Sequence, residues 1–385
     1  MIHANPAAVR DGVLTVDRKF HVGMLRYTSL IQSPIAAFNP PLRDGETIMD
    51  AIEVQTSKLP YRISTNQAEL RDLIRDAEIV YGYENYLHAA TIAREFGVPY
   101  IMILEYDLQT QMTESSSKVK NVLRKGIRHA RSALNYIRSI AEMRSAHSLH
   151  CNGYPIYEAT KLYNPNRLLY LDSRMSADML ISKSEMEYRS ASRHDRPLRL
   201  LYSGRYEPLK GAVDAVKVGM ECLGRGLKIE MHCYGQGSQK AQMQNIATDS
   251  RMQIHGAIPY PDLVKLSRTF DVFVCCHIQN DPSCTYLESF GAGLPIVGYD
   301  NRMLRGLLKA SGAGYASPIG KPGRVVENIV RMIESRGVDM YSVRAFEFAK
   351  EHTFESQFQK RVDAINALLK RDCEMKRLST TPTAT

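Results

Sequence analysis

The sequence predicts an α/β protein built from two doubly wound, Rossmann-like domains that face each other across a central cleft. Two observations lead to this prediction. The length of 385 residues exceeds the ~250–300 residues at which a single hydrophobic core stops growing. Segments typical of strands and helices also alternate twice, once on each side of a polar stretch at 182–197 that we interpret as the linker. We expect one domain over 1–190 and a second over 195–345.

The first half begins with strand-like and helix-like segments in alternation. The expected strands lie at 12–17, 33–38, 77–83 and 99–104, and the expected helices at 23–31 and 87–95. This order predicts a parallel sheet wrapped by helices. The turn at 17–21 would then bring Arg18 and Lys19 to the mouth of the cleft. Whether these cations face donor phosphates, an acidic acceptor or only solvent stays open.

A long helix is predicted over 118–144, and its charge is unusual. Apolar residues recur at steps of three and four, while the other faces carry eight cations and the single acid Glu142. This pattern fits a helix lying on an anionic membrane, and it equally fits a helix whose stripe packs on the domain's sheet. Gly126 could also divide the segment into two shorter helices packed in a closed core.

The second half repeats the alternation of strands and helices. The expected strands lie at 198–205, 227–235, 252–256, 271–276 and 295–299, and the expected helices start near 211 and 238 and span 261–269 and 283–292. The segment 346–371, with a helix at 355–371, could pack back on the first domain. Residues 372–385 would form a disordered tail.

Composition narrows the classes of function. Fifty Lys and Arg against 41 Asp and Glu give a net charge of +9, which favours anionic partners. No apolar run approaches the ~18–20 residues of a membrane-spanning helix, no signal peptide is visible, and seven cysteines without a CxxC pair fit a reducing cytoplasm. The eleven histidines form no HxH or HExxH pattern, so we expect no metal. Nucleic acid is disfavoured because no ladder of stacking aromatic residues accompanies the cations.

Loops that follow the strands of the second half contain groups suited to phosphate. Arg205 and Lys210 lie five residues apart in SGRYEPLKG and could grip adjacent phosphates, although alone they could be solvated charges. The turn YGQGS is a weaker signal, since a plain tight turn is as plausible.

The segment 279–301 adds a candidate anion site at a helix start. Asp281 followed by Pro282 predicts a capped helix N-terminus, which would leave the N–H groups of Ser283, Cys284 and Thr285 free for an anion. Glu288, about one turn later, could accept hydrogen bonds from two ribose hydroxyls; otherwise this is a capped, packed helix. Cys284 at this start could have a lowered thiol pKa, but a small packed residue is the commoner role.

SGRYEPLKG, YGQG, HGAIPYPDL and DPSCTYLESFGAGLPIVGYDN stand in the order and at the spacing of one family. Over 198–350 the chain resembles the retaining glycosyltransferases of family 4, the group 1 glycosyl transferases, which have the GT-B fold. The resemblance implies a nucleotide-diphosphate sugar such as a UDP- or GDP-sugar as donor, no metal cofactor, and a saccharide or lipid-linked acceptor. The residues that it assigns to the donor are Gly204, Arg205, Lys210, Gly235, Gly256, Ile258, Asn280, Asp281, Ser283, Cys284, Thr285 and Glu288.

The resemblance also implies roles within the reaction. Arg205 and Lys210 would hold the diphosphate, and Glu288 the ribose. Glu105, near where the family often has a histidine, would contact the donor sugar or an acceptor hydroxyl, while an acidic loop cap is nearly as plausible. Arg18 and Lys19 would line the acceptor side. We expect the acceptor proton to pass to the leaving phosphate.

One position departs from the family pattern. The family carries two glutamates eight residues apart, and counting back from Glu288 gives Asn280. This departure leaves a non-catalytic GT-B scaffold open. A GT-B sugar-nucleotide epimerase or phosphorylase would share the fold, although the full set of family 4 loops argues against it. The expected setting is bacterial surface or exopolysaccharide synthesis in the cytoplasm, with peripheral attachment to the inner face of the plasma membrane through 118–144 if the membrane interpretation holds.

Overall fold

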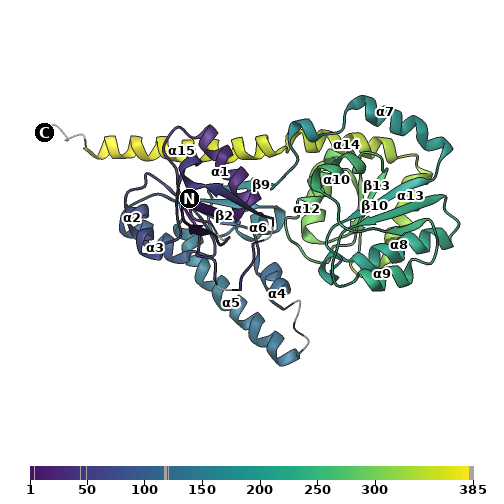
Figure 1. The fold of residues 1–385 in the computed structure, drawn as a ribbon, viewed down its shortest axis with the longest axis horizontal. Coiled ribbons are helices and arrows are strands. Elements are labelled where there is room, and N and C mark those ends of the chain that lie inside the picture. The colour runs from purple at the N-terminus through teal and green to yellow at the C-terminus, as the bar shows by residue number, and fades with distance from the viewer. Residues whose placement is uncertain (4, 44, 49, 117–118, 120, 381–385) are drawn as a thin grey trace.

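The protein consists of two α/β bodies side by side, joined by the segment 171–182 and by the last helix (Figure 1). The computed structural model describes residues 1–380 except 4, 44, 49, 117–118 and 120, and for 372–380 it describes only the backbone. Two Rossmann-like domains facing each other were expected, and this architecture is confirmed.

The sheet of the N-terminal domain is parallel, and a residue near the chain start completes it. Ile2 forms parallel bridges to Phe38 and to Gly82, so the order is β5, β3, Ile2, β6, β7, β8, β9. The strands are β3 (Ala36–Phe38), β5 (Arg62–Ser64), β6 (Val80–Tyr83), β7 (Tyr100–Leu104), β8 (Ser148–Asn152) and β9 (Arg167–Tyr170). Both faces of the strongly apolar β7 are buried, which is typical of a strand covered by helices on two sides.

The segment 12–17 does not form the first parallel strand, contrary to expectation. It forms β2 (Val13–Asp17), which pairs antiparallel with β1 (Ala8–Arg10) and β4 (Ala51–Gln55) in a separate three-stranded sheet. Asp11 and Gly12 connect β1 to β2 with φ of 49° and 76°. A two-residue Asp-Gly loop with both φ positive is the preferred connection of an antiparallel hairpin, and it explains the different pairing.

The C-terminal domain has six parallel strands in the order β12, β11, β10, β13, β14, β15. Numbered from β10, this is the 3-2-1-4-5-6 order of a nucleotide-binding Rossmann sheet. The strands are β10 (Leu198–Ser203), β11 (Ile229–Tyr234), β12 (Met252–Ile254), β13 (Val272–Cys275), β14 (Ile296–Tyr299) and β15 (Gly314–Ser317). The helices are α8 (Ala212–Gly224), α9 (Lys240–Ile246), α10 (Tyr260–Ser267), α11 (Thr285–Gly291), α12 (Arg302–Ser311), α13 (Pro322–Glu334) and α14 (Val338–Glu351).

The polar stretch 182–197 is not a linker. It forms α7 (Lys183–Ser192), which begins with a capping box between Ser182 and Glu185. The buried guanidinium of Arg189 donates hydrogen bonds to the carbonyls of Ala292 and Gly293, so α7 belongs to the C-terminal domain. The connection between the domains therefore lies at 171–182, about ten residues earlier than expected.

The last helix, α15 (Phe354–Thr380), returns to the N-terminal domain and runs along it (Figure 1). Phe358 packs on Tyr27 of α1 (Arg18–Leu30), with ring centroids 4.8 Å apart. Where we expected a disordered tail from residue 372, the backbone continues as helix through Thr380, and residues 381–385 lie outside the described part.

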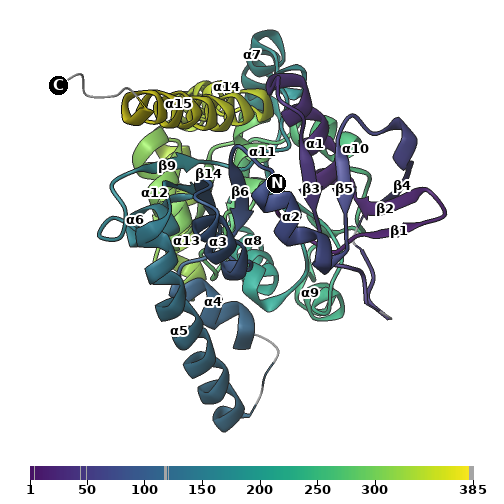
Figure 2. The same cartoon turned by 90° about the vertical axis from the view of Figure 1, so that its left-hand side faces the viewer.

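The remaining helices surround the N-terminal sheet. They are α2 (Leu70–Arg75), α3 (Leu87–Glu95), α4 (Leu108–Ser116), α5 (Val122–Ser145) and α6 (Tyr154–Ala159). Helices α4 and α5 pack on each other and extend together away from both domains, as Figure 1 and Figure 2 show. Within its described residues α5 is one continuous helix through Gly126, so the division into two shorter helices is wrong. We call α4 and α5 the arm.

Candidate active site

Three loops meet at the carboxyl-terminal edge of the C-terminal sheet, and glycines allow the close approach. A Cβ on Gly211, which has φ +60°, would lie 1.8 Å from the carbonyl oxygen of Cys276. A Cβ on Gly235 would lie 1.9 Å from the carbonyl oxygen of Gly204. The loops after β10, β11 and β13 therefore pack backbone against backbone, which brings most of the expected donor residues together at one edge.

Lys210 and Asp281 form a buried ion pair within this loop cluster. Lys210 Nζ donates to Asp281 Oδ2 at 2.8 Å, and both side chains are at least 86% buried. Burial favours a raised pKa for Asp281, but the charge and hydrogen bond of Lys210, together with His277 and Gln279, hold this pKa below its usual range. The structure thus brings both predicted donor residues together, but they form an ion pair with each other.

The predicted helix start at Asp281 is wrong. Helix α11 begins at Thr285 with Cys284 as its N-cap residue, and the backbone N–H of Ser283 already donates to the carbonyl of Asp281 at 2.9 Å. Asp281 pairs with Lys210 instead of capping the helix, and Pro282 lies in a tight turn before it. Burial raises the pKa of the Cys284 thiol to about 12, which keeps it protonated.

Buried polar side chains that we did not single out lie beside this pair. Both ring nitrogens of His277 are buried without a hydrogen-bond partner among the described residues, and the buried Gln279 side chain helps to lower the pKa of Asp281. Burial, followed by the charge of Lys210, lowers the pKa of His277 to about 3, so its imidazole is neutral. The sequence could have indicated these residues, because the polar run HIQND directly follows a buried strand.

Arg205 is exposed near the start of the loop after β10, and its charge acts on a residue of the other domain. Glu114 of α4 has a raised pKa because of its burial and the charge of Asp281, while the charges of Lys210 and Arg205 oppose this rise. These electrostatic contacts bring the arm of the N-terminal domain near the candidate diphosphate site. Glu114 was not predicted, because no motif marks it.

Glu288 is held by an arginine from the segment that joins the domains. Arg174 Nη2 and Nε donate to Glu288 Oε1 at 2.7 and 3.0 Å, and the guanidinium lies 4.1 Å from the ring centroid of Tyr260. The Glu288 side chain is 12% exposed, so its orientation is set by this contact. The neighbouring loop carries half-buried Gly256 and Ile258, and Gly256 accepts a hydrogen bond from Gly235 N at 3.3 Å.

Asn280, in the slot of the missing glutamate, has a structural hydrogen bond. Its Oδ1 accepts from the backbone N of Arg302 at 2.8 Å. The guanidinium of Arg302 in turn forms an ion pair with Asp107, which follows β7 in the N-terminal domain. Asn280 therefore supports the residue that bridges the two domains at this point.

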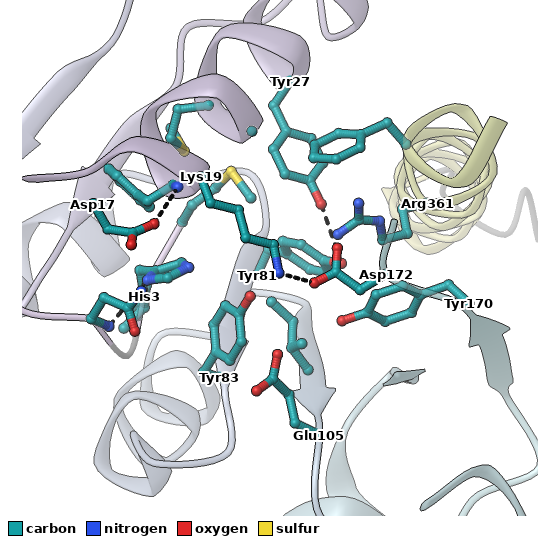
Figure 3. Close-up of a pocket in the computed structure, with 18 of the residues that line it drawn as sticks. His3, Asp17, Lys19, Tyr27, Tyr81, Tyr83, Glu105, Tyr170, Asp172 and Arg361 are labelled. Carbon is teal, nitrogen blue, oxygen red and sulfur yellow. Dashed lines mark hydrogen bonds and ion pairs between the residues drawn. The ribbon is translucent and has the colours of Figure 1, made fainter. Parts of the chain in front are cut away.

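A cavity of about 210 Å³ lies at the carboxyl-terminal edge of the N-terminal sheet (Figure 3). Lys19 does not lie on a loop, since Asp17 Oδ1 accepts from Phe20 N and caps α1, so that Arg18 and Lys19 form its first turn. Lys19 pairs with Asp172, which follows β9, and its Nζ lies 3.9 Å from Cys284 Sγ of the other domain. Arg18 instead pairs at the surface with Asp50.

Glu105 and Arg361 complete the charged lining of this cavity. Burial, then the charge of Asp172, raises the pKa of Glu105. Arg361 of α15 is buried against three rings, at 4.0 Å from the Phe358 centroid, 4.6 Å from Tyr170 and 5.5 Å from Tyr27. The last helix therefore supplies a wall of the cavity as well as packing, which sequence reasoning did not find.

Comparisons with known proteins support the fold. Residues 184–348 match the family described as glycosyl transferases group 1, and no curated protein matches the chain. Among solved structures, WaaG, a glycosyltransferase involved in lipopolysaccharide biosynthesis, is 13% identical with a TM-score of 0.61, covering 94% of this chain and 98% of that one. Anabaena Alr3699/HepE in complex with UDP-glucose is 12% identical with a TM-score of 0.62, covering 95% and 98%.

At these identities the structural likeness establishes the fold alone. No described helix is both long and apolar enough to cross a membrane. Among the residues that the structure describes, no three His, Cys, Asp or Glu side chains are grouped as a metal site. The chain has the two-domain GT-B fold, and its C-terminal domain matches the group 1 family of glycosyl transferases.

Proposed function

We propose that this protein is a retaining glycosyltransferase of family 4 that transfers a sugar from a nucleotide-diphosphate donor to an acceptor hydroxyl. The observation that carries the proposal is the placement of Arg205, Lys210 and Glu288 at one sheet edge, opposite a charged cavity of the other domain. Ligands of doubly wound sheets bind at this edge. Because Alr3699/HepE is described in complex with UDP-glucose, a UDP-sugar is the first donor to test, with GDP-sugars next.

In the proposed reaction the protein orients the donor and the acceptor and stabilises the developing charge. The acceptor oxygen bonds to the anomeric carbon, the bond from that carbon to the diphosphate oxygen breaks, and the acceptor proton passes to the leaving phosphate. Arg205 and Lys210 stabilise the charge that develops on the diphosphate, and no metal is required. Glu288 would bind the ribose, and Arg174 fixes its carboxylate for this role.

The cavity around Glu105 would receive the acceptor or the transferred sugar. Tyrosine hydroxyls, Asp172 and Glu105 offer hydrogen-bond partners for sugar hydroxyls, and the rings of Tyr27 and Tyr170 offer apolar surface. A cavity of about 210 Å³ has room for one sugar ring. WaaG is described as acting in lipopolysaccharide biosynthesis, which supports a saccharide or lipid-linked acceptor in bacterial surface synthesis on the cytoplasmic side.

A panel of UDP-, GDP- and ADP-sugars, assayed for slow donor hydrolysis, tests this proposal. We expect hydrolysis of one class, lost in Arg205→Ala and kept in Lys228→Ala, a matched control at an exposed position outside the site. The anomeric configuration of a product, read by NMR, tests retention. Absence of donor binding and hydrolysis would favour the non-catalytic scaffold, for which Asn280 at the glutamate position is the motivating observation. An epimerised donor, or turnover that requires phosphate, would identify the epimerase or phosphorylase instead.

A further inference from the structure

Helix α5 turns its apolar residues to the outside. The residues that it buries against the domain are Ser132, Tyr136, Ser139 and Met143. Its larger aliphatic side chains are exposed, with Leu123 at 74%, Ile127 at 60%, Leu134 at 49% and Ile137 at 62%. At 100° per residue these four lie on one stripe, roughly opposite the buried residues. The interpretation in which the stripe packs on the sheet is therefore wrong for this helix.

Exposed cations flank the stripe, and no described acid forms a salt bridge with them. Arg124, Arg131 and Arg138 lie within about 100° of Leu123 around α5, whereas Lys125 lies on the opposite side of the helix. The only acid of the helix, Glu142, is already paired with Arg94 of α3. Arg128 has a different role, because its guanidinium donates to the carbonyl of Ser115 at 2.6 Å and holds α5 to α4. Lys118 and Lys120 of the predicted basic segment lie outside the described residues.

We propose that this outer face of α5 docks on an anionic lipid bilayer. Helices that lie in a membrane interface combine an apolar stripe with flanking Lys and Arg, because the stripe enters the acyl boundary while the cations meet the headgroups. A second copy of the chain is a poorer occupant, since the same cations would face each other across the contact. The arm extends beyond both domains, so a flat bilayer can reach the stripe (Figure 2).

The arm also links the membrane surface to the cleft. Asp107 accepts from Thr110 N at 2.9 Å at the start of α4 and pairs with Arg302 of the C-terminal domain. Glu114 on the same helix lies within electrostatic reach of Lys210 and Arg205. Docking would therefore hold the cleft beside the lipid surface, where a lipid-linked acceptor is available. This last step rests on the proposed sugar transfer; the docking itself does not.

Co-sedimentation of the full chain with phosphatidylglycerol-containing vesicles tests the docking. We expect binding that weakens with salt and falls at least tenfold in the triple variant Arg124→Glu, Arg131→Glu, Arg138→Glu. The matched control is Lys228→Glu, Lys309→Glu, Lys321→Glu, which makes the same charge change at exposed positions of the C-terminal domain and should bind like the wild type. A second variant, Leu123→Ser, Ile127→Ser, Ile137→Ser, should lose binding while keeping its net charge.

Several results would overturn the proposal. Equal losses in the arm triple and the control triple would mean that net charge alone attracts the chain. Equal binding to vesicles of phosphatidylcholine alone would remove the role of the cations. A dimer that the serine variant dissociates, with no vesicle binding by the wild type, would assign the face to a second copy. Donor hydrolysis measured without vesicles should be unchanged in all variants, which separates this test from the test of sugar transfer.

Discussion

Lys210 Nζ lies 2.8 Å from Asp281 Oδ2 in a buried ion pair. Asp281 thus already pairs with the cation that we assign to the donor diphosphate. Two charges removed from water are stable there only because each compensates the other. A diphosphate that binds Lys210 must share or replace the carboxylate. Asp281 therefore acts as an internal anion at the candidate donor site.

The first prediction follows from that competition. Asp281→Asn should tighten the binding of UDP by about tenfold, equivalent to about 1.4 kcal/mol, because the ammonium no longer has an anionic partner. Isothermal titration calorimetry with the metal-free protein measures this. If the affinity is unchanged or weaker, the diphosphate does not use Lys210 in place of Asp281. Asp300→Asn, at an exposed pair with Arg305, is the matched control and should have no effect.

The second prediction separates the two cations of the first loop. Arg205→Ala and Lys210→Ala should each reduce donor affinity by roughly 10–100-fold, since a charge-assisted hydrogen bond is worth about 1.5–3 kcal/mol. Their effects on folding should differ. Loss of one partner from a buried pair costs about 3–5 kcal/mol, so Lys210→Ala should also lower the melting temperature, whereas exposed Arg205→Ala should not.

Thermal denaturation and calorimetry on the same samples check this second prediction. The double variant Lys210→Met, Asp281→Leu removes both charges and should recover stability without recovering donor affinity. A Lys210→Ala protein as stable as the wild type would contradict the buried pair. An Arg205→Ala protein with full donor affinity would remove Arg205 from the site.

The third prediction concerns the ribose. Glu288→Gln should weaken the binding of UDP but leave the binding of inorganic diphosphate unchanged, because the carboxylate lies on α11, apart from Lys210. Arg174→Ala should weaken UDP binding in the same way by releasing the Glu288 carboxylate, although no donor contact is assigned to Arg174 itself. Equal losses for UDP and diphosphate would place Glu288 at the phosphates instead.

Sequence reasoning predicted the C-terminal domain far better than the N-terminal one, for a physical reason. Strands β10, β13 and β14 are short, mostly buried apolar runs, β11 alternates buried with half-buried residues, and such patterns are local. In the N-terminal domain the sheet position between β3 and β6 is occupied by Ile2, which pairs with Phe38 and Gly82 far along the chain. The Asp11-Gly12 turn was a readable hairpin signal for residues 8–17, and we did not use it.

In the candidate site, too, local motifs could be predicted and contacts between distant residues could not. Motif residues Lys210, Asp281 and Glu288 could be found, but their partners could not be deduced from spacing. Arg174 reaches Glu288 across 114 positions, and Arg302 reaches Asp107 across 195. The exposed stripe of α5 was visible as periodicity, but its direction was not, because the buried face uses two serines and a tyrosine that carry no hydrophobic signal.

The last prediction is a loss of stability between about pH 4 and pH 8 that originates at Glu84, directly after β6. Burial, together with the charge of nearby Glu105, raises the pKa of Glu84 to about 8. Its Oε2 is buried without a hydrogen-bond partner among the described residues, so the ionised form is poorly compensated. The unfolded chain, with an ordinary carboxyl pKa near 4.3, releases this proton earlier, so the folded state binds more protons between about pH 4 and pH 8. Stability should therefore fall as the pH rises through this window, by at most about 5 kcal/mol for a difference of roughly 3.5 units.

Urea denaturation at pH 5, 7 and 9, followed by tyrosine fluorescence because the chain has no tryptophan, measures this dependence. Glu84→Gln should flatten it and stabilise the protein most at pH 9, since the amide does not ionise. Glu187→Gln, at an exposed position of α7, is the matched control and should keep the wild-type pH dependence. If the stability of Glu84→Gln depends on pH as strongly as that of the wild type, the Glu84 carboxyl ionises freely in the folded state. The loss of stability with rising pH then comes from other groups.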